Sequence, residues 1–174
     1  MEIFITDLAA YNNGYLIGEW LSLPMDEDEL KTKIDEILTI GAEACGDDEH
    51  EEIFLTDYEC DYLEIAEFDN PFKLNEMAEQ ADGLNDHKLK MVRFLLRNGL
   101  VNNFEEALEK YEDVIIHEDS TMEDVAYEFV NDCYNLNDLP SIIANNIDYE
   151  SIGREMEMDG RYFEEDGDIY EYLG

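Results

Sequence analysis

Positive charge is the scarcest feature of this 174-residue chain. It has 10 Lys and Arg against 47 Asp and Glu, which gives a formal net charge of −37 at pH 7. Proteins that bind nucleic acid need clustered Lys and Arg to neutralise phosphates, so no nucleic-acid partner is expected. An anionic membrane surface would repel the chain for the same reason. The composition therefore favours a partner that is itself positively charged.

Cysteine and long apolar runs are also sparse. The chain has 3 cysteines, at positions 45, 60 and 133, and no CxxC pair, which suits a reducing compartment. No run approaches the ~20 apolar residues of a membrane span. Residues 1–4 lack the basic start of a signal peptide. These features predict a cytoplasmic protein with no membrane partner.

The motifs of common catalytic and metal sites are missing. There is no GxSxG, GxGxxG or P-loop sequence, and no stretch fits the calcium loop D-x-[DN]-x-[DN]-G-x5-E. His50, His87 and His117 are isolated, with no HExxH and no Cys/His pair typical of zinc sites. Paired carboxylates carry no signal for catalysis when acids are this abundant. The sequence predicts no catalytic residue, no cofactor and no metal site beyond weak divalent-ion binding by surface carboxylates.

The chain nevertheless contains enough apolar residues to fold. Hydrophobic residues make up 45% of it and aromatic residues 11%, which argues against a disordered acidic tail. The acids are spread along the whole sequence, with 17, 15 and 15 of them in residues 1–60, 61–120 and 121–174. Self-repulsion among so many charges favours an elongated chain of small lobes. At the charge density of duplex DNA, a net charge of −37 corresponds to roughly 63 Å of duplex, or about 18 base pairs.

A small α/β domain is predicted for residues 1–61. Residues 3–6 and 15–21 are expected to form strands, separated by the turn signal Asn13-Gly14. Residues 53–55 are expected to form a third strand. These segments indicate a small sheet in the first third of the chain.

One helix is expected between the second and third of these strands. Asp26 is the expected N-cap, and the acids at 27–29 suit the positive end of the helix dipole. Apolar residues follow at helical spacing, and Gly41 is the expected C-terminal stop. An acidic loop over residues 47–52 then leads to the third strand.

A central helical domain is predicted for residues 62–103. Asn70-Pro71 is a typical cap followed by Pro at the first helical position. A second helix is expected over residues 86–98, with Gly99 as its stop. This helix carries the one basic run of the chain, which consists of Lys88, Lys90, Arg93 and Arg97. We interpret that run as pairing with surrounding acids inside the chain; a phosphate contact is the alternative.

A C-terminal α/β domain is predicted for residues 104–174. Residues 114–116 are β-prone, and residues 120–123 match a capping box at the start of a helix. The expected buried face of that helix comprises Val125, Ala126, Phe129, Val130 and Cys133. The predicted fold class is therefore α+β, with a helical domain between two α/β domains.

The end of this domain carries two further helices and a hairpin. Pro140 precedes a short helix, and Asp148 is expected to cap a helix that ends before Gly160. Residues 162–163 and 169–170 flank a turn signal at 165–167 and predict a β-hairpin.

Four segments of the chain resemble the ArdA family of antirestriction proteins. Residues 6–14, followed by Leu16 and Glu19-Trp20, resemble the start of the family, and Asp57-Tyr58-Glu59 is similar to the segment that closes its first domain. Residues 124–134, continuing through Leu139-Pro140, resemble its antirestriction motif, and residues 147–155 resemble its C-terminal signature. The resemblance spans nearly the whole chain, but the middle matches mainly in length and helical character.

The resemblance implies a function and a partner. ArdA proteins are encoded by plasmids and conjugative transposons and protect incoming mobile DNA by blocking type I restriction-modification enzymes. They act as elongated, curved homodimers whose surface carboxylates imitate the phosphates of bent B-form DNA. Their target is the DNA-binding groove of the methyltransferase core, formed by specificity and modification subunits. They catalyse no reaction and use no cofactor.

Two sets of residues are expected to carry this function. The phosphate-mimicking surface is assigned to Asp26, Glu27, Asp28, Glu29, Asp47, Asp48, Glu49, Glu51, Glu52, Glu105, Glu109, Glu112, Asp113, Glu118 and Asp119. The dimer interface and antirestriction motif are assigned to Val125, Tyr127, Phe129, Val130, Cys133, Tyr134 and Leu136.

Two other functions remain open at this point. An acidic chaperone or sequestering partner of a basic DNA-binding protein would use the same charge without a DNA-like shape. An enzyme would require a divalent-ion-dependent turnover that depends on one or two acids.

Overall fold

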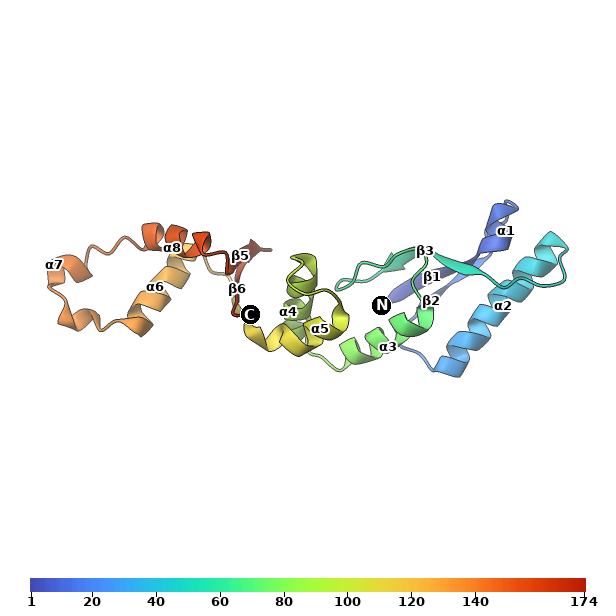
Figure 1. Cartoon of the computed structure of the whole chain (residues 1–174), viewed down its shortest axis with the longest axis horizontal. Coiled ribbons are helices and arrows are strands. Elements are labelled where there is room, and N and C mark those ends of the chain that lie inside the picture. Colours follow the sequence, from blue (N-terminus) through green and yellow to red (C-terminus); the bar gives the residue numbers. More distant parts are fainter. The chain divides into compact units, whose positions relative to one another are not determined.

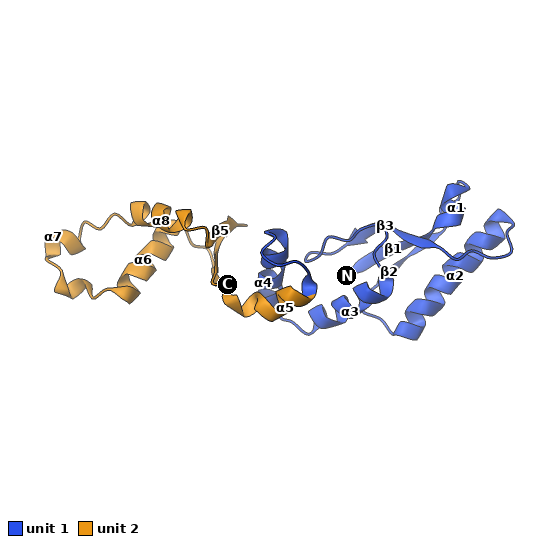
Figure 2. Ribbon diagram, viewed as in Figure 1, with its two compact units in different colours: residues 1–104 blue, residues 105–174 orange.

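The computed structural model describes all residues, 1–174, as an α+β chain with two three-stranded antiparallel sheets and eight α-helices (Figure 1). It divides into two compact units, residues 1–104 and 105–174 (Figure 2). None of its helices is long and apolar enough to cross a membrane. The finer division at residues 61 and 103 stays a prediction.

The first unit contains one sheet and four helices. Its elements are β1 (Glu2–Asp7), α1 (Leu8–Asn12), β2 (Gly18–Ser22), α2 (Glu27–Cys45), β3 (Ile53–Glu59), α3 (Pro71–Asp82) and α4 (Asp86–Arg97). The strand order is β2-β1-β3, so β1 is the central strand. Ile3 and Ile5 on β1 are fully buried, and α2 and α3 contribute Leu30 and Leu74 to the same core. The three expected strands are present, but β2 begins at Gly18 and not at residue 15, and β3 is longer than predicted. Helix α1, between β1 and β2, was not predicted: Asp7 caps it by accepting a hydrogen bond from the N–H of Ala10.

Helix α2 begins where the sequence predicts but ends later. The Asp26 side chain accepts hydrogen bonds from the backbone N–H groups of residues 28 and 29. The predicted stop at Gly41 is wrong, because the helix continues to Cys45 and ends at Gly46 with φ +77°. Gly41 is glycine for a different reason: a Cβ there would lie 2.7 Å from Cγ of Asp7. The missing side chain lets α2 approach the end of β1.

The two helices of the middle segment follow their predicted caps. The Asn70 side chain accepts a hydrogen bond from the N–H of Phe72, and Pro71 is the first residue of α3. Asn75 on α3 is buried and exchanges two 2.8 Å hydrogen bonds with the backbone of Met25. Gly99, with φ +63°, follows the end of α4 as expected.

The second unit is built on the other sheet. Its elements are α5 (Phe104–Lys110), which begins at the last residue of the first unit, a 3-10 turn η1 (Tyr111–Asp113), β4 (Val114–His117), α6 (Met122–Cys133), a 3-10 turn η2 (Leu136–Asp138), α7 (Ser141–Ala144), α8 (Tyr149–Met158), β5 (Tyr162–Glu165) and β6 (Asp168–Tyr172). The strand order is β4-β6-β5. Asp166 and Gly167, both with positive φ, form the predicted hairpin turn. Val125 of α6 packs in the core with Tyr162 and Ile169.

Helices α6 and α8 pack closely against each other. The capping box of α6 is formed by Thr121 and Asp124, one residue later than predicted. Asp148 caps α8 as predicted, through a hydrogen bond from the N–H of Ser151. A Cβ at Gly153 would lie only 2.5 Å from the carbonyl oxygen of Met122, so this contact requires glycine.

Candidate functional site

Exposed carboxylates are the dominant feature of both units. Every residue assigned from the sequence to the phosphate-mimicking surface is exposed. Asp26 and the acids at 27–29 lie at the start of α2, and those between residues 47 and 52 lie in the loop before β3. The acids between residues 105 and 119 lie on α5, on η1 and in the turn after β4. Only Asp7 among the acids is fully buried.

These acids are exposed, but several of them also make contacts within the chain. The carboxylate of Asp26 caps α2, accepting hydrogen bonds of 3.0 and 3.2 Å from backbone N–H groups. Oδ2 of Asp47 lies 3.1 Å from Nε2 of His50. The remaining acids of the α2–β3 loop are exposed to water, where screening by salt is strong.

Most of the scarce cations make contacts within the chain. Lys33 lies 3.1 Å from Glu19, and Lys110 lies 2.7 Å from Glu106. Hydrogen bonds to these glutamates raise the pKa of both lysines. All four cations of the basic run on α4 also make contacts within the chain. The exposed charge of the chain stays strongly negative, and pairing of the basic run with acids stays a prediction.

Two residues of that run face a hollow of mixed charge. Arg93 and Arg97 line an open depression of about 790 Å³ in the first unit, together with Asp61 and Glu64. A groove that follows a nucleic-acid backbone would need a uniformly positive lining. The mixed lining therefore gives no support to the phosphate-contact interpretation.

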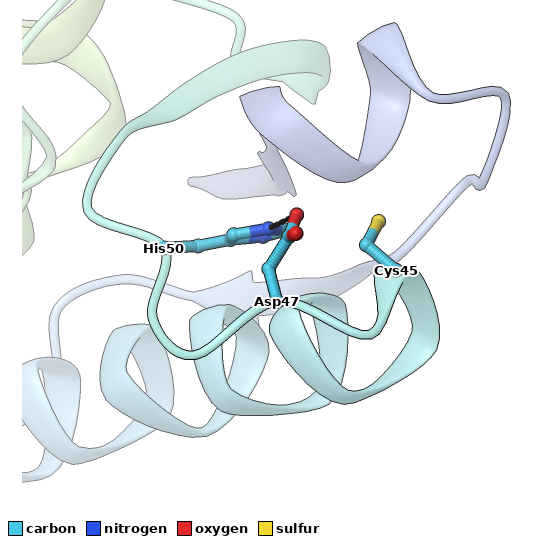
Figure 3. Close-up of side chains that lie close together, drawn as sticks. All are labelled: Cys45, Asp47 and His50. Atoms are coloured by element: carbon cyan, nitrogen blue, oxygen red, sulfur yellow. Dashed lines mark hydrogen bonds and ion pairs between the residues drawn. The ribbon is translucent and has the colours of Figure 1, made fainter.

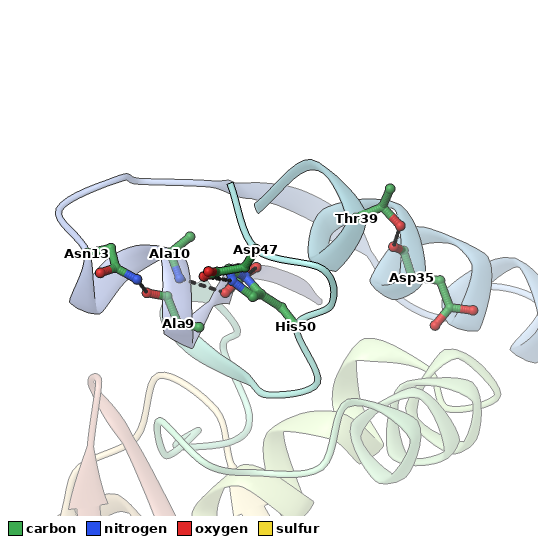
Figure 4. A network of polar contacts seen from close by, with 8 residues as sticks. Ala9, Ala10, Asn13, Asp35, Thr39, Asp47 and His50 are labelled. Atoms are coloured by element: carbon green, nitrogen blue, oxygen red, sulfur yellow. Dashed lines mark hydrogen bonds and ion pairs between the residues drawn. The ribbon is translucent and has the colours of Figure 1, made fainter. Parts of the chain in front are cut away.

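A buried charged cluster lies beside the acidic loop. Nδ1 of His50 is 2.7 Å from Oδ2 of Asp7, and their side chains are 3% and 0% exposed. Asp7 also caps α1 by accepting a 2.8 Å hydrogen bond from the N–H of Ala10. Figure 4 shows the side chains of His50 and Asp47 next to Ala10. Hydrogen bonding to Asp7, and then to Asp47, raises the pKa of His50 above 6.5.

The antirestriction-like motif divides between the inside and the outside of the second unit. Val125, Ala126 and Val130 are buried. The prediction that Phe129 and Cys133 are also buried is wrong: Phe129 is 44% exposed, and Cys133 is exposed. The reason is tertiary, because α6 packs mainly against α8 and meets the strands only where Val125 lies with Tyr162 and Ile169.

The outward part of the motif is rich in aromatic side chains. Tyr127 and Tyr134 are 54% and 60% exposed, and Leu136 is partly buried. Phe129 lies edge-on to Tyr134, with ring centroids 6.5 Å apart. On α7, Ile142 and Ile143 are 78% and 53% exposed. Exposed aromatic and aliphatic side chains of this kind are common in protein interfaces.

The Asp7–His50 pair is the feature that reasoning from the sequence missed. The two residues are 43 positions apart, and no spacing rule connects them. The one local signal is Gly41, whose lack of a side chain leaves space for Asp7.

The chain matches a known protein family. The family model described as "Antirestriction protein (ArdA)" matches residues 3–171. No curated protein matches the chain.

Proposed function

This chain belongs to the ArdA family of antirestriction proteins, and we propose that it inhibits a type I restriction-modification enzyme by presenting a carboxylate surface in place of DNA. The family consists of inhibitors that catalyse no reaction, and their target is a restriction enzyme. The observation that carries the proposed mechanism is the exposure of acids on both units of a chain with a net charge of −37.

We propose that the contact is the DNA-binding groove of the specificity and modification subunits. That groove binds phosphates and is therefore positive. Complementary charge speeds association, so binding should be fast at low salt. Many exposed carboxylates share the interaction, and no single one of them should dominate the affinity. Such inhibition would protect incoming plasmids or conjugative transposons in the bacterial cytoplasm.

A competition experiment tests this mechanism. A labelled duplex with the recognition site is bound to a purified type I methyltransferase, and the protein is added at fixed moderate salt. We expect stoichiometric displacement of the duplex, with little displacement from an unrelated basic DNA-binding protein. Equal displacement from both would favour the alternative of an acidic chaperone or sequestering protein. No displacement from several type I enzymes would refute the proposed target.

We further propose a homodimer formed through the second unit. The exposed apolar surface around Phe129 and Tyr134 supports it. Val125 and Val130 would then support the interface from inside the fold, since they are buried. Phe129→Glu and Tyr134→Glu should yield folded monomers in sedimentation analysis. Ile40→Glu, at an exposed apolar position of α2, is the matched control. A full dimer in both motif variants would refute this interface.

A further inference from the structure

Three side chains with different metal-binding atoms meet at the C-terminal end of α2. The ligand atoms of Cys45, Asp47 and His50 all lie within 4.8 Å of one another. Cys45 is the last residue of the helix, and Gly46, in the left-handed conformation, turns the chain so that the loop returns over the helix end. Figure 3 shows the three side chains gathered there, with the imidazole of His50 extending toward the carboxylate of Asp47.

Asp7 orients the imidazole of His50 through the ring nitrogen that does not face Asp47. Its buried carboxylate holds Nδ1 of His50 at 2.7 Å, which leaves Nε2 directed at Asp47. Metal-binding histidines commonly donate their other ring N–H to a carboxylate in this way, and that outer partner fixes the ring and its tautomer. The cluster thus has both a set of possible ligands and the support that such ligands require.

The distances suit one tetrahedral ion. With metal–N and metal–O bonds of about 2.0–2.2 Å, two ligand atoms at a tetrahedral angle lie about 3.4 Å apart. Nε2 of His50 and Oδ2 of Asp47 are 3.1 Å apart, so a small outward movement of the exposed Asp47 would admit an ion between them. The Cys45 sulfur is within reach of the same point.

We propose that Cys45, Asp47 and His50 bind one divalent transition-metal ion of the Zn²⁺ class, with water in the fourth position. A thiolate and an imidazole favour zinc-like ions over Mg²⁺ or Ca²⁺, which prefer sites made only of oxygen ligands. The negative end of the α2 dipole lies beside Cys45 and favours a cation. On binding, the ion replaces the proton of the Cys45 thiol and any proton on Nε2 of His50, and both pass to solvent.

The site would connect three parts of the first unit. Cys45 belongs to α2, His50 to the loop before β3, and Asp7 links His50 to the end of β1. A bound ion would therefore hold the loop that carries Asp48 and Glu49 in one position on the domain. The site rests on its own geometry and not on the proposed inhibition of a restriction enzyme.

Metal analysis of the full-length protein tests the proposal. The protein is dialysed against Zn²⁺ with a large excess of Mg²⁺, which occupies the surface carboxylates. We expect one tightly bound Zn²⁺ per chain. Cys45→Ser should weaken binding by more than the about 10- to 100-fold that the loss of an outer partner costs. Cys133→Ser, at an exposed cysteine in the second unit, should leave binding unchanged.

Two further measurements keep the test decisive. With Co²⁺ in place of Zn²⁺, the wild type and Cys133→Ser should show a thiolate-to-cobalt charge-transfer band that Cys45→Ser lacks. Asp47→Asn should weaken Zn²⁺ binding, whereas Asp48→Asn, at the exposed neighbouring position, should not. This pair of variants tests the site even if Cys45→Ser fails to fold. Equal Zn²⁺ binding by the wild type and the ligand variants would show binding by surface carboxylates only and overturn the site. The absence of the cobalt band in the wild type would also overturn it.

Discussion

Replacing Gly41 by Ala should destabilise the first unit, although Ala is the better helix former. Gly41 lies inside α2 and faces Asp7, whose carboxylate is fully buried. The added methyl group would lie 2.7 Å from Cγ and 3.2 Å from Cβ of Asp7, closer than ordinary contact at 3.4–4 Å. Either α2 or the end of β1 must therefore move.

The size of the effect follows from three contributions. Forcing a methyl group into a packed site costs about 1–3 kcal/mol. Displacing Asp7 weakens its cap on α1, which is worth about 1 kcal/mol. The higher helix propensity of Ala relative to Gly offsets about 1 kcal/mol of this loss. We therefore expect the free energy of unfolding to fall by about 1–3 kcal/mol.

Urea unfolding, monitored by tryptophan fluorescence, measures this change directly. The single tryptophan of the chain, Trp20, lies on β2 in the same unit. With an m-value of about 2 kcal/mol/M, the midpoint should fall by about 0.5–1.5 M. Gly83→Ala is the matched control, since the nearest atom to a Cβ there is 3.4 Å away; it should be neutral or stabilising by up to about 1 kcal/mol. A Gly41→Ala midpoint equal to or above that of the wild type would refute the reasoning.

Three further predictions concern the second unit and the charged surface. Gly153→Ala should lower the thermal midpoint of the second unit by about 4–8 °C for each kcal/mol lost, because its Cβ would lie 2.5 Å from the Met122 carbonyl oxygen; an unchanged midpoint by circular dichroism would contradict this. Hydrogen bonds from Thr121 lower the pKa of Asp124 below 3.8. The stability that this cap gives to α6 is therefore complete above pH 3.8, and it is lost as the pH falls through the lowered pKa of the folded state. Asp124→Asn should therefore reduce the loss of helicity on acidification, and a titration curve identical to that of the wild type would count against it. Raising the ionic strength from 0.1 to 1 M shortens the screening length from about 10 to about 3 Å, so the association rate with the restriction enzyme should fall steeply; a salt-independent rate would argue against a charged surface as the recognition element.

Local signals in the sequence predicted most helix ends correctly. Asp26, Asn70 and Asp148 cap the helices that follow them. A cap depends on a hydrogen bond to a backbone group two or three residues away, so short-range sequence contains the information. The turn at Asp166-Gly167 was predictable for the same reason, because positive φ favours these residue types.

The errors share a cause that lies outside any local window. Gly41 is the residue type typical of a helix end, but its role depends on Asp7, which lies far away in sequence at the end of β1. The helical period identified an apolar set on α6, yet in the folded unit Val125 and Val130 are buried and Phe129 is exposed. Periodicity ranks the residues of a helix by face, and only the neighbouring elements decide how wide the buried face is.

The sequence by itself determined the charge of the protein, the positions of most of its elements and, through four motifs, its resemblance to a family. These properties follow from composition and from interactions between near neighbours. The tertiary structure alone brought Asp7 to His50 and placed Cys45 and Asp47 around the same imidazole. It also separated the motif of α6 into core and surface residues. Such outcomes depend on contacts between residues far apart in the chain, which packing of the whole domain selects.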